Sequence, residues 1–205
     1  MNLKKWLMLM LVPAGLLAAM FLYAVLFHAY RAAPVDKLRI ASPPPQDRRV
    51  ALVAAARGLK GVLYDQLKGG HNNIGGRLGF LVCIDVPRIA YAAAGVDLDS
   101  MLREDYKIHA RFYPVEKPGN VPETPFFVRR VRNLYAYCRA NGKLLHNPPE
   151  LRAGDLIFPN TSHIVLVSEV RADGTISIIE NAPWTNMTVE YSNSDKPRDV
   201  CRILD

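Results

Sequence analysis

Cysteine is scarce in this chain of 205 residues, which has only Cys83, Cys138 and Cys201. Three cysteines are too few for a fold built on disulfides, and none belongs to a Cys-x-x-Cys pair of the kind that binds zinc or exchanges disulfides. The sequence therefore predicts no metal and no cofactor. Cys138 and Cys201 could form a bridge that leaves Cys83 reduced, but the sequence alone does not decide the connectivity.

The chain also lacks a strongly basic run. Its net charge is +7, or +5 without Lys4 and Lys5, a modest excess that suits work beside anionic lipids and cell-wall polymers. The densest basic cluster, Arg129, Arg130 and Arg132, falls in a helical pattern typical of a solvated face. No arginine-rich stretch is interleaved with aromatic residues, so nucleic acid is not an expected partner.

Charge is absent from residues 6–27, an apolar run of about 22 residues that is long enough to cross a hydrocarbon layer. A secretory signal would have a shorter apolar stretch followed by small residues, whereas bulky aromatic residues occupy that region here. The run therefore predicts an uncleaved single-pass anchor in the inner membrane. Lys4 and Lys5 precede it, which favours a cytoplasmic N-terminus and a periplasmic domain. The alternative is a soluble chain whose first helix is buried.

Three segments follow from this interpretation. Residues 1–30 form the cytoplasmic stub and the anchor, residues 31–46 form a proline-rich linker, and residues 47–205 form one domain that is long enough for a compact core. The composition of residues 31–46 excludes helix and favours an extended spacer that lifts the domain from the membrane. Within the domain, the glycine-rich stretch at residues 69–76 predicts an irregular loop.

Apolar residues recur with helical spacing in the first part of the domain and with strand spacing in the second. Helices are expected over residues 50–63, 86–94, 98–104 and 127–138. Asp97 should cap the third helix, and Gly95 should end the second. Strands are expected over residues 155–158, 163–168, 175–179 and 187–191, with a hairpin at Asp173-Gly174. This order indicates an α+β fold in which one helix packs across an antiparallel sheet.

Cys83 lies at the start of the helix expected over residues 86–94, because Pro87 is tolerated only in a first turn. A helix N-terminus favours a thiolate, and the polar loop before it would leave the sulfur accessible. The alternative is a buried cysteine that acts as a small apolar residue. Asp85 and Arg88 lie one turn into the helix and fit a salt-bridged pair on the surface. We assign them no catalytic role.

A thiolate nucleophile needs a base, and His163 is the strongest candidate among the five histidines. It alone opens an expected strand directly after a polar turn, where a side chain is both rigid and open to a cleft; a purely structural histidine is the alternative. Glu180 and Asn181 end the neighbouring strand, so either could orient the imidazole. The candidate catalytic residues are therefore Cys83, His163, Glu180 and Asn181, with the backbone N–H of Cys83 as an oxyanion donor.

Several short sequence motifs occur in a fixed order between about Leu59 and Asn181. They are Tyr64-Asp65, Cys83-Ile-Asp85, Ala94-Gly95, Glu104-Asp105, Arg129-Arg-Val131-Arg-Asn133-Leu134, Ala153-Gly-Asp155, His163-Ile-Val and Ile179-Glu180-Asn181. In that order they resemble the papain-like NlpC superfamily of bacterial cell-wall amidases and endopeptidases, and more closely a bacterial domain-of-unknown-function family, twelve eighty-seven. The superfamily usually has histidine, asparagine or glutamine as its third catalytic residue, and the closer family looks like His-Asn where this chain has Glu180-Asn181.

The resemblance implies a papain-like NlpC-type fold and a thiol peptidase or amidase, in which Cys83 attacks an amide carbonyl and His163 protonates the leaving amine. The expected substrate is a peptide or related amide bond of peptidoglycan, and envelope proteins are further candidate partners. A lipid-directed thiol amidase or acyltransferase would use the same residues. A catalytically silent envelope binding or assembly module is the third interpretation, which the departure at Glu180 favours.

Overall fold

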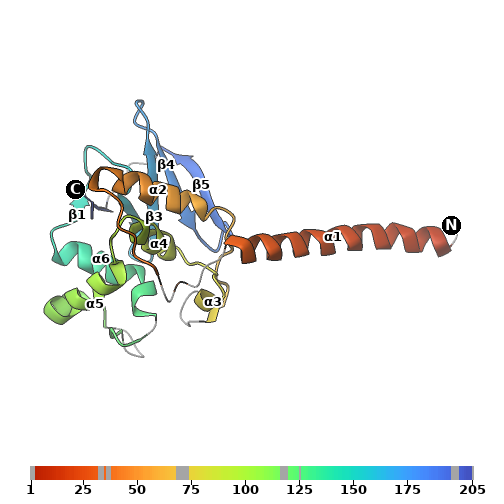
Figure 1. The fold of residues 1–205 in the computed structure, drawn as a ribbon, viewed down its shortest axis with the longest axis horizontal. Coiled ribbons are helices and arrows are strands. Elements are labelled where there is room, and N and C mark those ends of the chain that lie inside the picture. The colour runs from red at the N-terminus through yellow and green to blue at the C-terminus, as the bar shows by residue number, and fades with distance from the viewer. Residues whose placement is uncertain are drawn as a thin grey trace.

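A computed structural model describes residues 3–31, 35, 38–67, 74–115, 120–124, 126–194 and 199–204. The N-terminal helix α1 (Leu3–Arg31) projects from a domain in which helices pack against a single sheet (Figure 1). Within the described part of the chain, no helix meets the length and apolar character that a membrane crossing requires. The domain is of the α+β class with an antiparallel sheet, which confirms this part of the sequence prediction.

Four longer helices of the domain form in the regions that the apolar spacing indicates, with ends that differ from the expected ones by up to five residues. They are α2 (Arg48–Gly58), α4 (Asp85–Ala93), α5 (Leu98–His109) and α6 (Val131–Ala140). Short 3-10 turns occur at Pro45–Asp47, Ala110–Phe112 and Phe127–Arg129. Asp97 caps α5 as expected, because its side chain accepts a hydrogen bond from Ser100 N at 3.0 Å. Gly95 follows α4 with a φ of 78°, the left-handed conformation that glycine favours at a helix end.

The glycine-rich stretch that was expected to be irregular contains a short helix, α3 (Ile74–Arg77). Gly75 lies directly against the carboxylate of Asp65, and a Cβ at Gly75 would overlap that carboxylate. The missing side chain thus lets a turn of helix approach a buried acidic group, which composition alone does not reveal. Residues 68–73, including His71, lie outside the described residues.

The described sheet has six strands in the order β1-β6-β2-β3-β4-β5, and all its neighbouring strands are antiparallel. The four expected strands correspond to β2 (Leu156–Asn160), β3 (His163–Val170), β4 (Ile176–Asn181) and β5 (Thr188–Asn193). Two strands of three residues escape the sequence pattern because such short runs carry little alternation: β1 (Leu144–His146) and β6 (Asp199–Cys201). β6 lies between β1 and β2, so the last strand of the described chain is inside the sheet.

The main core lies between the sheet and the helices. Ile164, Leu166 and Ile179 are fully buried and contribute to the same apolar cluster as Leu52 of α2 and Leu134 of α6. Alternate residues of β3 and β4 form a second buried cluster, so both faces of these two strands carry apolar side chains. This explains why the two strands appear in the sequence as nearly continuous apolar runs.

A disulfide joins Cys138 near the end of α6 to Cys201 in β6, and Cys83 is a free thiol. Both bridged cysteines are fully buried. The connectivity that the sequence left open is thus the one that keeps Cys83 available. The bridge also fixes the inserted strand β6 to the helical part of the domain.

The described part of the proline-rich segment packs along the domain, which differs from the free spacer expected for residues 31–46. Val35 is fully buried, and its N–H donates to Gly76 O at 3.1 Å. Ala41 N donates to Ala92 O at 2.9 Å. Pro44 has the extended backbone that proline favours, and the main-chain N–H groups of Val35 and Ala41 find partners on the domain surface.

The C-terminal end of α1 contacts the domain directly. The His28 imidazole stacks on the Phe80 ring with 4.4 Å between ring centres. Its Nε2 lies 3.1 Å from Leu78 O, and its Nδ1 lies 3.4 Å from Leu63 N. The end of α1 is therefore fixed to the segment that follows α2 and to the segment that precedes α4.

Candidate active site

Cys83 lies in the turn that leads into α4, and the residue as a whole is partly buried. The main-chain N–H groups of Ile164 and Ile84 lie close enough to the sulfur to act on its pKa. Ile164 directly follows His163 in β3. The thiol therefore lies beside the start of β3, at the same end of the strand as the candidate base.

Burial raises the pKa of the Cys83 thiol to about 12, and the negative charge of Asp85 acts in the same direction. The N–H groups of Ile164 and Ile84 lower the pKa but do not outweigh the loss of hydration. This direction is opposite to the thiolate expected at the helix start, because the loss of hydration outweighs the nearby N–H groups. A thiol with this pKa is protonated at neutral pH, so it could act as a nucleophile only with a base that takes its proton.

His163 begins β3, and its imidazole pairs with Glu180 near the end of β4. Nε2 of His163 lies 2.6 Å from Oε2 of Glu180, and the ring packs edge-on against Trp184 with 4.7 Å between ring centres. The other carboxylate oxygen of Glu180 accepts hydrogen bonds from the Tyr191 hydroxyl at 2.7 Å and from Trp184 Nε1 at 3.2 Å. The imidazole is thus held on one side by a fully hydrogen-bonded carboxyl group and on another by an indole.

The hydrogen bonds at Glu180 keep it ionised. Burial acts to raise the pKa of Glu180, but the hydrogen bonds from His163, Tyr191 and Trp184 outweigh burial and hold the pKa below its usual value. A carboxylate at Nε2 makes that nitrogen the N–H donor, which leaves Nδ1 of His163 for a second partner. This arrangement can orient an imidazole and stabilise its charged form when it accepts a proton.

Asn181, the other candidate for the orienting role, makes different contacts. Successive side chains of a strand alternate, so Glu180 and Asn181 project from opposite faces of β4. Asn181 Nδ2 donates to Val62 O at 3.1 Å and to Thr188 Oγ1 at 2.9 Å. Among the described residues no hydrogen bond joins Asn181 to His163, and Asn181 instead ties β4 to β5 and to the chain after α2.

A buried group of charged residues supports the Cys83 turn, and the sequence patterns did not reveal it. Asp85 Oδ2 accepts a hydrogen bond at 2.9 Å from the N–H of Val82, the residue before Cys83. Arg88 Nη1 and Arg129 Nη2 donate to the same carboxylate at 2.6 and 2.7 Å. The surface positions expected for Asp85, Arg88 and Arg129 are wrong, because all three are almost completely buried.

Two further carboxylates extend this buried charge cluster. Asp99 pairs with Arg88, and Asp65 lies 3.2 Å from Arg129 Nη1. A signal for the cluster is present in the sequence, since Asp85 follows directly on the apolar run 81–84 and a charge inside a buried stretch must be paired. Asp65, Asp85 and Arg129 also fall in the short sequence motifs on which the expected family resemblance was based.

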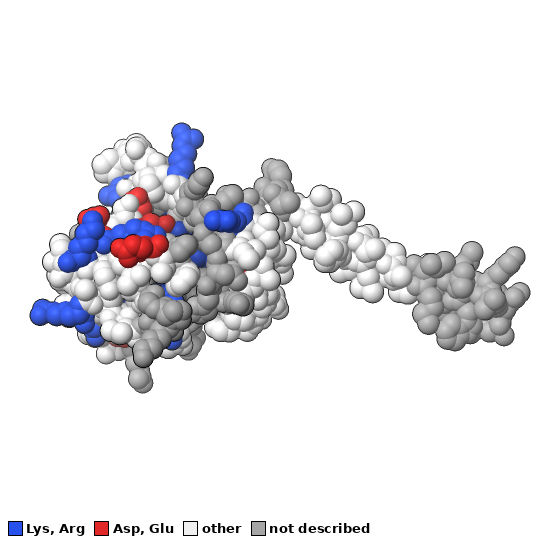
Figure 2. Space-filling model, turned by 90° about the horizontal axis from the view of Figure 1, so that it is seen from below, with Lys and Arg blue, Asp and Glu red and all other residues white. Residues whose placement is uncertain are grey.

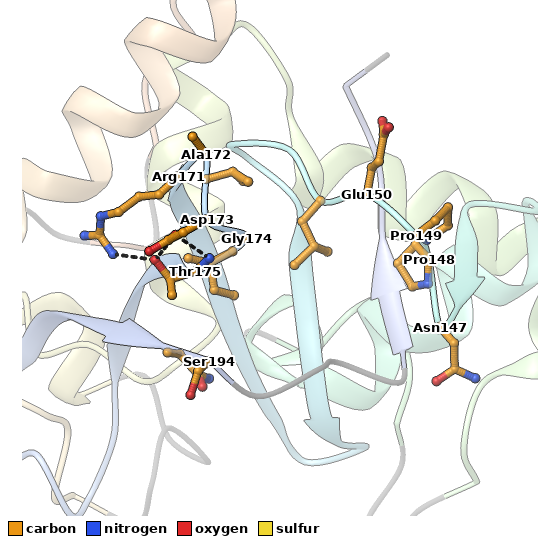
Figure 3. A pocket seen from close by; sticks show the side chains of 14 residues that line it. Asn147, Pro148, Pro149, Glu150, Arg171, Ala172, Asp173, Gly174, Thr175 and Ser194 are labelled. Carbon is orange, nitrogen blue, oxygen red and sulfur yellow. Dashed lines mark hydrogen bonds between the residues drawn. The ribbon is translucent and has the colours of Figure 1, made fainter.

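Other surface features lie apart from these residues. A hollow of about 980 Å³ is lined by residues 147–151, by the β3–β4 hairpin at residues 170–176, and by Asn193 and Ser194 (Figure 3). It lies at the opposite end of β3 from His163, and Asp173 beside it accepts a hydrogen bond from Thr175 N within the turn. Within the described ranges, no group of three histidine, cysteine or acidic side chains is placed to hold a metal ion.

A family model matches residues 75–195, a range that contains Cys83, His163, Glu180 and Asn181. Its description is domain of unknown function (DUF1287). The chain belongs to this family. The match confirms the family that was expected from the order of the short sequence motifs. In this DUF1287 protein, α1 and α2 lie outside the matched residues.

Among solved structures, the DUF1287 protein is similar to the peptidoglycan hydrolase RipB from Mycobacterium tuberculosis. The TM-score is 0.46 and the sequence identity is 18%, over 81% of this chain and 74% of the RipB chain. No curated protein sequence matches the chain.

Proposed function

We propose that this DUF1287 protein is a papain-like, NlpC-type cysteine hydrolase that cleaves an amide or peptide bond in peptidoglycan. The observation that supports this most strongly is the arrangement at the start of β3. The main-chain N–H of Ile164 lies close enough to the Cys83 sulfur to lower its pKa, and the preceding residue, His163, is paired with the Glu180 carboxylate. A thiol, an imidazole and an orienting carboxylate are the parts that a thiol hydrolase requires.

In the proposed mechanism, His163 accepts the thiol proton as the Cys83 sulfur attacks the carbonyl carbon. The C=O electron pair moves to oxygen, and the main-chain N–H of Cys83 stabilises the resulting oxyanion. Glu180 stabilises the imidazolium that forms. His163 then protonates the leaving amine, and water hydrolyses the thioester to release the acid and restore the thiol.

The raised pKa of Cys83 favours one form of this mechanism. A thiol with a pKa of about 12 does not exist as a resting ion pair with an imidazole at neutral pH. Proton transfer to His163 therefore accompanies the attack on the carbonyl. In this form of the mechanism, the thiol, the imidazole and the carbonyl carbon reach their reacting positions only when substrate is bound and water has left the site.

The proposal includes a location: a single-pass protein of the inner membrane with its catalytic domain in the periplasm. The uncharged run at residues 6–27, preceded by Lys4 and Lys5, supports an anchor with a cytoplasmic N-terminus. The disulfide between Cys138 and Cys201 supports an oxidising compartment, since such bridges are rare in the cytosol.

The second candidate is a catalytically silent envelope module, and the raised pKa of Cys83 favours it. A lipid-directed thiol amidase or acyltransferase would use the same residues as the peptidoglycan hydrolase. Activity on defined substrates separates these possibilities, because only the two enzymes release products, and they release them from different amides.

The decisive experiment incubates the full-length protein with peptidoglycan sacculi and, in parallel, with lipid amides, followed by mass spectrometry of the products. We expect new peptide fragments from sacculi with the wild type and none with Cys83→Ala or His163→Ala. Circular dichroism melting curves should show that both variants remain folded. Hydrolysis of sacculi by either variant would refute the mechanism, and products from neither substrate with the wild type would favour the silent module.

A further inference from the structure

We propose that the face of the domain around the end of α1 rests on the surface of a phospholipid bilayer, with the candidate site beside that surface. This inference rests on the proposed anchoring of α1 in the membrane. It describes a domain held against the bilayer, in place of a domain lifted from it by a spacer.

The apolar run of α1 ends where the domain begins. At 1.5 Å per residue the run at residues 6–27 is about 33 Å long, close to the ~30 Å thickness of bilayer hydrocarbon. Phe27, its last residue, lies against Gly61, where a Cβ would be 2.6 Å from the Phe27 ring. The next residue, His28, is buried and stacks on Phe80. No length of chain therefore remains between the hydrocarbon boundary and the domain.

Four large apolar side chains are exposed around this junction, and we call them the α1-side rim. The relative exposures are 60% for Ile74, 58% for Leu78, 64% for Trp184 and 38% for Met187. Leaving such side chains in water is unfavourable when an apolar or interfacial environment lies within reach. Single exposed apolar residues are common, but a group that surrounds the end of an apolar helix indicates a contact surface.

The hydrogen bonds at the junction place the rim beside α1. His28 contacts Leu78 O, and Leu78 N donates to Ile74 O at 3.2 Å. On the other side, His28 contacts Leu63 N, and Leu63 forms an antiparallel bridge with Met187. One part of the rim thus comes from α3 and the turn after it, and the other part comes from the turn between β4 and β5.

The figures agree with this placement. In Figure 1, α3 and the turn between β4 and β5 lie on the side of the domain from which α1 projects. On the face seen in Figure 2, the described part of α1 has no charged side chains, and most of the coloured side chains lie on the part of the domain away from α1. Arg77, between Ile74 and Leu78, is also exposed, so the rim carries a cation beside its apolar side chains. The exposed tryptophan of the rim is what a headgroup layer accommodates, since tryptophan is enriched at membrane interfaces.

Trp184 connects the rim to the candidate site. Its ring packs against His163, and its Nε1 donates to Glu180. If the rim lies in the headgroup layer, the His163 imidazole lies at the bilayer surface. The inference therefore deepens the proposed function: the bonds that the site can reach are amides held next to the membrane, and not those in distant layers of the wall.

The test uses the two tryptophans of the full-length chain, Trp6 and Trp184. Trp6→Phe leaves Trp184 as the only tryptophan, and this variant is placed in lipid nanodiscs made with and without brominated phospholipid. We expect brominated lipid to quench the emission of Trp184. Transfer from detergent to nanodiscs should also shift that emission to shorter wavelength and reduce its quenching by acrylamide in water.

A matched control places a tryptophan at the far end of β3. Val170 is exposed and lies at the opposite end of this strand from His163. In the Trp6→Phe, Trp184→Phe background, Val170→Trp should show no quenching by brominated lipid. Quenching of Trp184 equal to that of Val170→Trp would overturn the inference. Protection of Trp184 that depends on protein density and not on brominated lipid would also overturn it, because a second copy would then cover the rim.

A third variant separates this inference from the anchor on which it rests. Trp184→Phe leaves Trp6 as the only tryptophan, so its quenching by brominated lipid reports the insertion of the N-terminal run. Absence of this quenching would refute the anchor and the inference together. Quenching of Trp6 without quenching of Trp184 would refute the inference alone. None of these measurements depends on turnover, so failure of the hydrolase proposal would be distinguished from both results.

Discussion

His163 Nε2 and Glu180 Oε2 lie 2.6 Å apart, and Tyr191 and Trp184 supply hydrogen bonds to the other oxygen of the same carboxylate. The residue at which this chain departs from the expected family pattern is therefore the residue that contacts the candidate base. A carboxylate brings a full negative charge to the imidazole, whereas an amide or a second imidazole would bring a dipole. Glu180 is thus suited to stabilise an imidazolium that forms during turnover.

Glu180→Gln tests this positioning role because it keeps the size of the side chain and removes its charge. We expect kcat to fall by about 100-fold or more with little change in KM, since an orienting group acts mainly on the step that charges the imidazole. Asn181→Ser is the matched control: it should lower the melting temperature by removing the ties to Val62 and Thr188 while leaving kcat nearly unchanged. Equal losses of kcat in the two variants would contradict the assignment.

The raised pKa of Cys83 predicts slow alkylation. At pH 7 we expect iodoacetamide to label Cys83 more slowly than it labels glutathione, with the rate rising about tenfold per pH unit while the thiolate remains the minor form. Mass spectrometry of the intact protein measures the labelling, and Cys83→Ala should take up no label because the other two cysteines are bridged. Labelling at pH 7 faster than that of glutathione would show that the thiol is activated at rest.

The same pKa shift predicts a loss of stability at alkaline pH. The pKa of Cys83 is about 12 in the folded chain against an ordinary value of 9.0, so the folded state binds more protons between these values. The free energy of unfolding should therefore decrease as the pH rises from about 9 towards 12. Tyrosines titrate in the same window, so the relevant quantity is the difference from Cys83→Ala in urea unfolding curves. A wild-type curve that follows the variant throughout would contradict the shift.

The buried charge cluster predicts a large effect at Asp85 and a small one at the surface. Asp85→Asn removes the buried carboxylate that Arg88 and Arg129 share and leaves two buried guanidinium groups with only Asp99 and Asp65 as charged partners, so we expect it to destabilise the fold by about 3 to 5 kcal/mol. Glu104→Gln removes the exposed pair with Lys107 and should leave the urea midpoint almost unchanged. Similar midpoints for the two variants would mean that the cluster is not buried as described.

The disulfide predicts a strong dependence of stability on redox conditions. The bridge spans 63 residues of chain, and loop-closure entropy assigns such a loop about 4 kcal/mol of stabilisation. Cys201→Ser should therefore lower the urea midpoint, and dithiothreitol should destabilise the wild type but not this variant. Wild-type unfolding curves that are identical with and without reductant would contradict the bridge.

The periodic parts of the fold were predictable from the sequence because each depends on neighbours in the chain. The apolar stripe that ends at Ala94 predicted α4, and the apolar runs predicted β3 and β4. These predictions are possible because side chains recur at a regular spacing in helices and in strands. The positions of Asp85 and Arg129 were not predictable in this way. Their pairing joins residues 44 positions apart, and the spacing of Arg129 with Arg130 and Arg132 resembles a solvated face as closely as a buried one.

The candidate site was only partly predictable for a related reason. Sequence order places Cys83 before a helix and His163 at the start of a strand. The choice between Glu180 and Asn181 depends on which face of β4 lies toward the imidazole. The alternation of side chains places the two residues on opposite faces of the strand but does not show which face that is. The raised pKa of Cys83 depends on the surroundings of the sulfur, which local sequence does not determine.

The position of β6 has a consequence for how the protein is made. Asp199–Cys201 lies between β1 and β2, and the Leu204 carbonyl near the end of the chain accepts a hydrogen bond from Arg49 of α2. Translation must therefore pass Cys201 before the sheet can close and Cys138 can meet its partner. A chain that stops before β6 would leave β1 and β2 without the strand that joins them and Cys138 without its disulfide partner.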